Sequence, residues 1–146
     1  MSPRPSPPRR AWTALLLCAG CSHTGASGSQ DDLLSVTELA ARYALLHEVP
    51  PVLREGRPLC LTVDGHAASP EVLARLSEGA TEVSSSGVGC AVPLAVVVEV
   101  SRVRVSGGVA TARAGVRLGP ARVLTLRRVD GQWRLVGAAA GADAGP

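Results

Sequence analysis

Apolar and polar residues alternate along most of the second half of the chain, which is typical of β-strands with one buried face. The apolar positions keep one parity over 94–100 and take the opposite parity at Val103 and Val105. One extra residue in a strand would return both sets of side chains to the same face. The change of parity therefore predicts a β-bulge near Ser101 and Arg102.

Three turn signals divide this region into strands. Gly107-Gly108 and Gly119-Pro120 are breaks in the alternation, and Asp130-Gly131 is a two-residue hairpin signal because both central residues of that turn take positive φ. Trp133 and Leu135 are expected to face inward on the last strand. The region predicts a four-stranded antiparallel meander with one apolar face.

The first half of the mature chain has helical periodicity. Apolar residues at spacings of three and four predict a helix over 31–48, for which Asp31 and Asp32 supply the N-cap and a favourable charge. Ser69-Pro70 predicts the start of a second helix that ends near Gly79, because Ser is a good N-cap and Pro is favoured at the first helical position. Short strands are predicted at 59–63 and 81–83.

Together these elements predict an α+β fold in which two helices pack on one face of a mainly antiparallel four- to five-stranded sheet. The second helix is expected to pack on the meander. A single domain is expected over 31–137, followed by a disordered tail over 138–146 that is mostly Ala and Gly. No parallel crossover pattern repeats, which argues against a doubly wound fold.

A helix followed by a curved meander that ends in Asp-Gly-Gln-Trp-Arg-Leu resembles the nuclear-transport-factor-2-like superfamily and its cystatin-like relatives. The resemblance covers only the meander part of the chain. The chain departs from that pattern in two ways: a strand, a helix and a cysteine pair follow the first helix, and the aromatic lining of the superfamily's cone is missing. The resemblance therefore implies a fold and assigns no residue roles.

The N-terminus has the pattern of a secretory signal peptide over residues 1–20. Arg4, Arg9 and Arg10 precede an apolar run over 11–19, which is too short to span a bilayer as a helix. The Arg pair is also reminiscent of a twin-arginine signal, but its neighbours fit that pattern poorly, so the general secretory route is favoured.

Leu17-Cys18-Ala19-Gly20-Cys21 resembles the lipobox of bacterial lipoproteins, with Cys18 at the position where Leu is preferred. The resemblance implies that Cys21 becomes the mature N-terminus and carries lipid, including a palmitate-type acyl chain. Residues 21–30 would then be a flexible tether. The alternative is an ordinary signal peptide cut nearby, which would leave Cys21 as a free thiol. Ser22 is not the Asp that retains lipoproteins in an inner membrane, so in a two-membrane cell the expected location is the outer membrane, facing the periplasm.

Cys60 and Cys90 are the two cysteines that remain after the signal and the lipidated residue. In an oxidising envelope compartment, a single pair of cysteines is most simply a disulfide. A two-ligand metal site and a redox pair are the alternatives, although structural zinc usually has four ligands. We expect no metal and no cofactor.

Composition and charge restrict the partners. Aromatic residues make up 2% of the chain, which argues against the stacking platforms of nucleic-acid-binding proteins. Every basic residue is Arg, and Lys, Ile, Asn and Phe are all absent, which is typical of a G/C-rich genome. Without residues 1–20 the chain has twelve basic and twelve acidic residues, so the net charge of +3 belongs to the signal and supports no nucleic-acid partner.

Two groups of polar residues are candidates for function. Asp64, His66 and Ser69 lie close enough in sequence for a hydrolytic site, but a turn and a helix cap explain Asp64 and Ser69. Eight arginines come from the meander, and several of them fall at outward positions. They predict an Arg-rich outer sheet face, either solvated or used to dock an envelope protein or a cell-wall polymer. They are Arg102, Arg104, Arg113, Arg117, Arg122, Arg127, Arg128 and Arg134.

The sequence therefore favours a lipid-anchored protein of the bacterial envelope that binds or scaffolds a partner and is not an enzyme. A small envelope hydrolase or transferase is the alternative. A buried Asp64–His66 pair in a cleft would favour the enzyme, and exposure of the pair on a turn would favour the binding protein.

Overall fold

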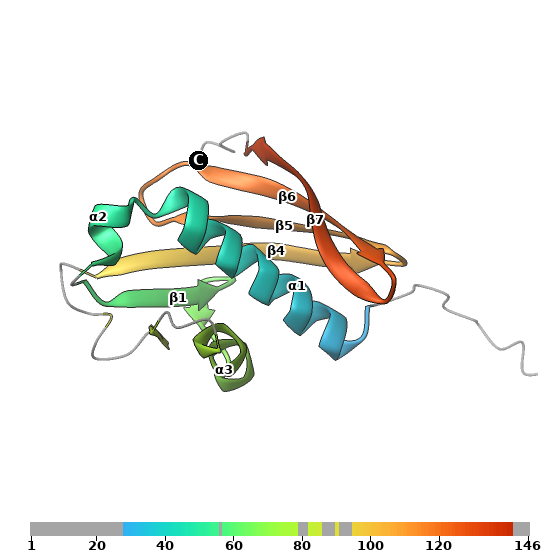
Figure 1. The fold of residues 1–146 in the computed structure, drawn as a ribbon, viewed down its shortest axis with the longest axis horizontal. Coiled ribbons are helices and arrows are strands. Elements are labelled where there is room, and N and C mark those ends of the chain that lie inside the picture. Colours follow the sequence, from blue (N-terminus) through green and yellow to red (C-terminus); the bar gives the residue numbers. More distant parts are fainter. Residues whose placement is uncertain (1–27, 56, 79–81, 86–89, 91–94, 142–146) are drawn as a thin grey trace, which may run out of the picture.

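The computed structural model describes residues 28–55, 57–78, 82–85, 90 and 95–141. The predicted signal peptide, Cys21, most of the predicted tether and the last five residues lie outside the described residues, as does Gly79. The fold is α+β, with a mainly antiparallel sheet of strand order β2-β1-β4-β5-β6-β7 in which β3 also pairs with β1 (Figure 1). The fold class is confirmed, although the sheet has seven strands where four or five were expected.

The additional strands are short, and the described residues contain three α-helices where two were expected. The helical segments are α1 (Gln30–Tyr43), η1 (Ala44–Glu48), α2 (Pro51–Arg54) and α3 (Pro70–Ser77). The strands are β1 (Leu59–Val63), β2 (His66–Ala67), β3 (Val83–Ser85), β4 (Val96–Ser106), β5 (Val109–Val116), β6 (Ala121–Val129) and β7 (Gln132–Ala140).

The predicted meander is confirmed as β4 to β7, each strand antiparallel to the next. Asp130 and Gly131 take φ values of 51° and 79°, as the predicted hairpin turn requires. Strand β7 pairs with β6 as far as Ala140 opposite Arg122. The ordered domain thus extends beyond the expected boundary at 137, because backbone pairing with β6 holds even this Ala-rich segment.

Trp133 and Leu135 share one parity on the last strand, as predicted. Trp133 is buried, and Leu135 lies opposite the buried Leu126 although it is 40% exposed. The register of β6 against β7 shifts only after this pair, between Leu126 and Thr125, so the regular alternation of β7 ends past Leu135.

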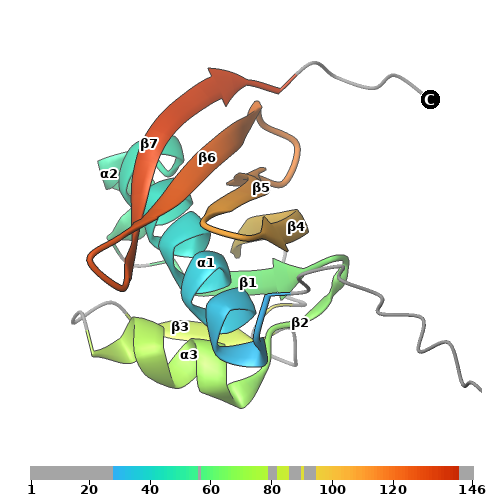
Figure 2. The ribbon, with the colours of Figure 1, turned by 90° about the vertical axis from the view of Figure 1, so that its right-hand side faces the viewer.

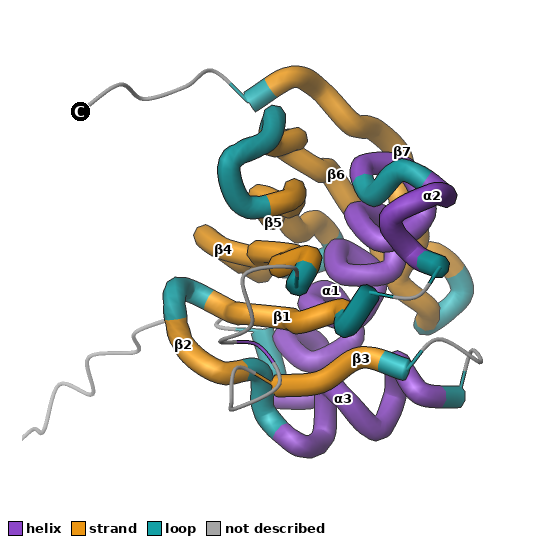
Figure 3. The backbone as a smooth tube through the Cα atoms, turned by 90° about the vertical axis from the view of Figure 1, so that its left-hand side faces the viewer, coloured by secondary structure: helices purple, strands orange, loops and turns teal. Residues whose placement is uncertain are grey.

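Strand β1 connects the meander to the smaller part of the sheet. It pairs in parallel with β4 along its whole length, from Leu59 opposite Val96 to Val63 opposite Val100. Its other edge is shared by β3, which is parallel to it, and by β2, which is antiparallel (Figure 3). The brief strand expected at 81–83 is therefore found slightly later, at β3.

Helix α1 begins slightly earlier in the chain than predicted. Its N-cap is Ser29, whose Oγ accepts a hydrogen bond from the backbone N–H of Asp32 at 3.1 Å, while the Asp32 carboxylate accepts from the Ser29 N–H. Asp31 and Asp32 were expected to be the cap and instead lie in the first turn. The helix also changes at Ala44 into the π-helical η1, which ends at Glu48.

Helices α1 and α2 lie on one side of the curved meander, and the core lies between α1 and that concave face (Figure 2). Small residues contribute to this interface: α1 and η1 both contact β5, and the buried positions of these elements include Ala40, Ala44, Ala110, Ala112 and Ala114. None of the described helices covers the opposite, outer face of the meander.

Helix α3 has the predicted start, with Ser69 Oγ accepting from the Val72 N–H and Pro70 in the first turn. The expectation that this helix packs on the meander is wrong: α3, with its buried Val72 and Leu76, mainly contacts α1 and β3. The cause is topological, since α3 connects two parallel strands at the β1 edge of the sheet.

The predicted disulfide is present. Cys60 on β1 and Cys90 are bonded, with their Cα atoms 5.8 Å apart. Cys60 is fully buried. The bond closes a loop that contains β2, α3 and β3, so it ties this smaller part of the molecule to the centre of the sheet.

Replacing both Cys60 and Cys90 with Ala is expected to lower the free energy of unfolding by roughly 3–4 kcal/mol, because the bond closes a loop of this length in the unfolded chain. Urea denaturation followed by circular dichroism measures the change. The meander does not depend on the bond, so the far-ultraviolet spectrum of the folded protein should be retained. An unchanged urea midpoint would contradict the expectation.

Candidate functional site

The Asp64, His66 and Ser69 group does not form a hydrolytic site. Asp64 and Gly65 form the β1–β2 turn with φ values of 48° and 78°, and His66 is exposed on β2. Ser69 is the N-cap of α3. No hydrogen bond joins these three side chains in the part of the chain that the structure describes. The pair is thus exposed on a turn, the arrangement that favours a binding protein.

Asp64 instead stabilises the bulge that the sequence predicted in β4. Its backbone N–H donates to the Val100 carbonyl at 2.8 Å, and its Oδ1 accepts from the Arg102 N–H at 2.9 Å. The Asp64 side chain therefore provides a partner for a backbone donor that the irregular strand leaves unpaired in the sheet.

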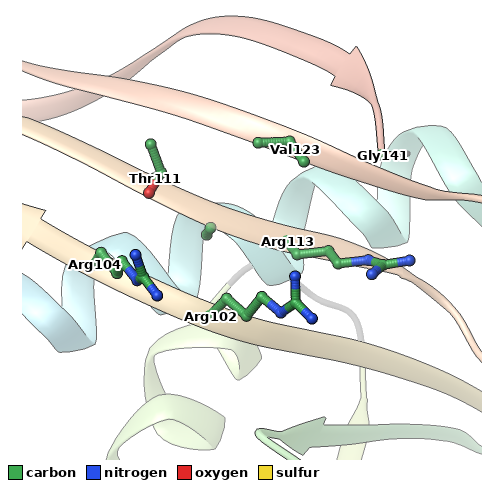
Figure 4. Close-up of a pocket in the computed structure, with 7 residues that line it drawn as sticks. Arg102, Arg104, Thr111, Arg113, Val123 and Gly141 are labelled. Carbon is green, nitrogen blue, oxygen red and sulfur yellow. The ribbon is translucent and has the colours of Figure 1, made fainter. Parts of the chain in front are cut away.

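The bulge determines where two arginine side chains point. Ser101 lies opposite Arg113 and Arg104 opposite Thr111, so Arg102 and the residue after it share one position on the β5 side. Arg102 has φ 54°, a left-handed conformation that costs a non-glycine residue about 1 kcal/mol or more. As a result both Arg102 and Arg104 project from the outer face, whereas the alternating valines remain on the core side (Figure 4).

Only some of the eight meander arginines lie on the predicted Arg-rich face. Arg122 and Arg128 do not, because they have the parity that faces the helices. Arg122 Nε lies 3.2 Å from Glu48 Oε1, and Arg128 forms an ion pair with Asp32 at 3.2 Å. Arg117 is paired with Glu99 at 2.7 Å.

Two adjoining hollows lie on the outer face around the bulge. One, of about 250 Å³, is lined by Arg102, Arg104, Thr111 and Arg113 among others (Figure 4). The second, of about 340 Å³, shares Arg102 and Arg113 with it and reaches Glu99. Within the described residues, the Arg102 and Arg104 guanidinium groups form no ion pair or hydrogen bond. Among the described residues that line the first hollow, none is acidic.

Such an arrangement favours an anionic ligand. Neighbouring guanidinium groups repel each other, and an oxyanion between them would remove that repulsion. The planar fork of Arg also matches carboxylate and phosphate oxygens in pairs. Binding is the chemistry that these side chains can perform, since an arginine neither donates its proton nor acts as a nucleophile under ordinary conditions.

A second polar cluster, missed from the sequence, joins α1 to the last hairpin. Asp32 accepts from the indole N–H of Trp133 at 2.9 Å and from Ser29 Oγ at 2.9 Å, and it pairs with Arg128. The hydrogen bond from Trp133, followed by that from Ser29, lowers the pKa of the Asp32 carboxyl, with a further contribution from the Arg128 charge. The spacing of Ser29 and Asp32, typical of a capping box, was the signal that could have located it.

The described residues contain no group of three or more His, Cys, Asp or Glu side chains arranged to hold a metal ion. No helix among them combines the length and the apolar character needed to cross a membrane.

Comparison of the chain with protein-family models, with curated proteins and with solved structures found no match. The roles of the residues above therefore rest on the geometry of this chain alone.

Replacing Asp32 with Asn is expected to destabilise the fold most near neutral pH. A carboxyl whose pKa is lowered on folding stabilises the protein above its unfolded pKa, and this contribution is lost as the pH falls through the folded pKa. The difference in unfolding free energy between wild type and variant should therefore shrink in acid, below the ordinary value of 3.8. Urea denaturation at a series of pH values measures it.

Asp130→Asn is the matched control, because Asn also tolerates the left-handed conformation of the hairpin turn. It should leave the pH dependence of stability close to that of the wild type. Equal pH dependence in wild type and the Asp32 variant would show that the Asp32 contacts do not stabilise the charged carboxylate.

Proposed function

We propose that this protein is a lipid-anchored, non-catalytic binding module of the bacterial envelope. The observation that carries the binding role is the pair of outward arginines at the bulge, Arg102 and Arg104, whose charges no described residue neutralises. The location rests on the lipobox-like segment that ends in Cys21.

The outer sheet face is the surface proposed for the partner. It is free of described helices, and it also presents Arg127 and Arg134, which lie directly opposite each other on β6 and β7. Both are exposed and form no ion pair with another described residue. Arginines on four adjoining strands form an extended positive surface, and such a surface suits a ligand that repeats its negative charges.

We therefore propose an acidic cell-wall polymer as the partner. A polymer with carboxylate or phosphate groups along its length can contact the hollow and the Arg127–Arg134 region at the same time, and several weak contacts then add. A lipid anchor at Cys21 would hold the domain close to such a polymer. In a cell with two membranes, the proposed location is the outer membrane, facing the periplasm.

Replacing Cys21 with Ser is expected to abolish fatty-acid labelling and to leave unprocessed precursor, because the thiol is the proposed site of lipid attachment. Metabolic labelling with a fatty-acid analogue and gel mobility measure both effects. Cys18→Ser is the matched control and should be processed and labelled like the wild type. Normal processing of the Cys21 variant would contradict the lipoprotein assignment.

Replacing Arg104, Arg127 and Arg134 together with Gln is expected to weaken binding to purified acidic cell-wall polymer by about tenfold or more at low salt. Exposed charge contacts contribute up to about 1 kcal/mol each, so three of them suffice for this loss. Co-sedimentation of the full mature protein with the polymer measures it, and the wild-type binding should also weaken as salt is added.

Arg57→Gln is the control, because Arg57 is an exposed arginine in the loop before β1 and lies outside the meander. It should change binding by less than about twofold. If the triple variant binds as tightly as the wild type, the outer face is not the partner surface.

A further inference from the structure

The bulge gathers positive charge on one small area of the outer face. In a regular strand Arg102 and Arg104 would also share a face, but the valines of β4 would then change sides partway along. The bulge keeps Val98, Val100 and Val105 on the core side while it places both guanidinium groups beside Arg113. Three arginines from two strands thus border one hollow of about 250 Å³.

The carboxylates nearest to this hollow are already used. Asp64 Oδ1 accepts from the backbone N–H of Arg102, and Glu99 is paired with Arg117. Neither forms an ion pair with the guanidinium groups of Arg102 and Arg104 among the described residues. The charges of Arg102 and Arg104 are therefore left for a ligand to neutralise.

We infer that this hollow is a phosphate-binding site, in which Arg102 and Arg104 supply forked donors and the hydroxyl of Thr111 lies at its border. The inference rests on the proposed function and specifies that a phosphate group of the acidic partner binds in the hollow. A phosphate monoester carries between one and two negative charges near neutral pH, which matches two arginines without other partners better than the single charge of a carboxylate does. Its tetrahedral oxygens can also accept from groups on both strands at once.

The left-handed conformation of Arg102 supports a site that is already formed. A strained non-glycine residue persists where its surroundings hold it, and here the Asp64 carboxylate and the register of β4 with β5 do so. The base of the Arg102 side chain is therefore positioned before any ligand arrives, which reduces the ordering that binding requires.

The test is calorimetric titration of the full mature protein, in a non-ionic detergent at constant ionic strength, with inorganic phosphate as the probe. We expect saturable binding of one phosphate, weakened about tenfold or more by Arg102→Gln and by Arg104→Gln, because each removes a charge-assisted pair of donors. Arg102→Lys, which keeps the charge and loses the fork, should bind more weakly than the wild type and more tightly than Arg102→Gln.

Arg57→Gln is the matched control, because Arg57 is an exposed arginine in the loop before β1 and lies outside the meander. It lies outside the hollow and should change phosphate affinity by less than about twofold. Equal losses in all three glutamine variants, equal binding of acetate, or no saturable phosphate binding would each overturn the inference. Retained disulfide and circular dichroism spectrum show that the variants are folded.

Two further arms identify the source of the phosphate. Binding is measured to vesicles that contain phosphatidic acid and to a soluble wall polymer that carries phosphate monoester groups, each with wild type and Arg104→Gln. The source is the one whose binding weakens about tenfold in the variant, and the inference is wrong if neither weakens. Polymer binding that survives the loss of phosphate binding would overturn this site alone, whereas phosphate binding without any polymer binding would overturn the proposed function.

Discussion

Close approach of α1 to the meander is the constraint on which the rest of the structure depends. The buried face of the helix includes Ala40 and Ala44, and the strand that it contacts, β5, buries Ala110, Ala112 and Ala114. Small side chains on both surfaces let the helix lie close to the sheet, and dense packing then leaves little room for larger residues. A chain with so few aromatic residues can close its core in this way, and a single long helix occupies the concave face while the outer face is left to other uses.

The same close approach brings the charges of α1 and η1 to the margins of the sheet. Glu48 meets Arg122 at one end, and Asp32 meets Arg128 and Trp133 at the other. Both ion pairs join elements far apart in sequence, so they orient the helix along the meander. In these ion pairs, Arg122 and Arg128, which point toward the helices, already have carboxylate partners. Glu48 and Asp32 are therefore not available to neutralise arginines on the outer face.

Sequence patterns were most informative where one local rule determines the geometry. The change of parity after Val100 requires a bulge, and Asp130-Gly131 requires a hairpin, so both were predicted in place. The inward position of Arg122 follows from strand parity, but its ion pair could not be predicted in the same way, because Glu48 lies far away in the chain. The role of Asp64 was missed for a related reason: its sequence neighbours explain a turn, while its hydrogen bond to the bulge depends on the pairing of β1 with β4.

Without residues 1–20 the chain has a net charge of zero, which conceals an uneven distribution. Of the twelve arginines that remain, eight lie in the meander and the residues after it, where only three of the twelve acidic residues are found. The ion pairs of Arg117, Arg122 and Arg128 remove part of this excess, and what is left, Arg102 and Arg104 included, lies on the outer face. At physiological salt, screening acts over about 8 Å, so a ligand near that face responds to the local positive potential and not to the neutral total. Composition could not reveal a basic surface, because such a surface arises from strand parity and from the pairing of the other charges.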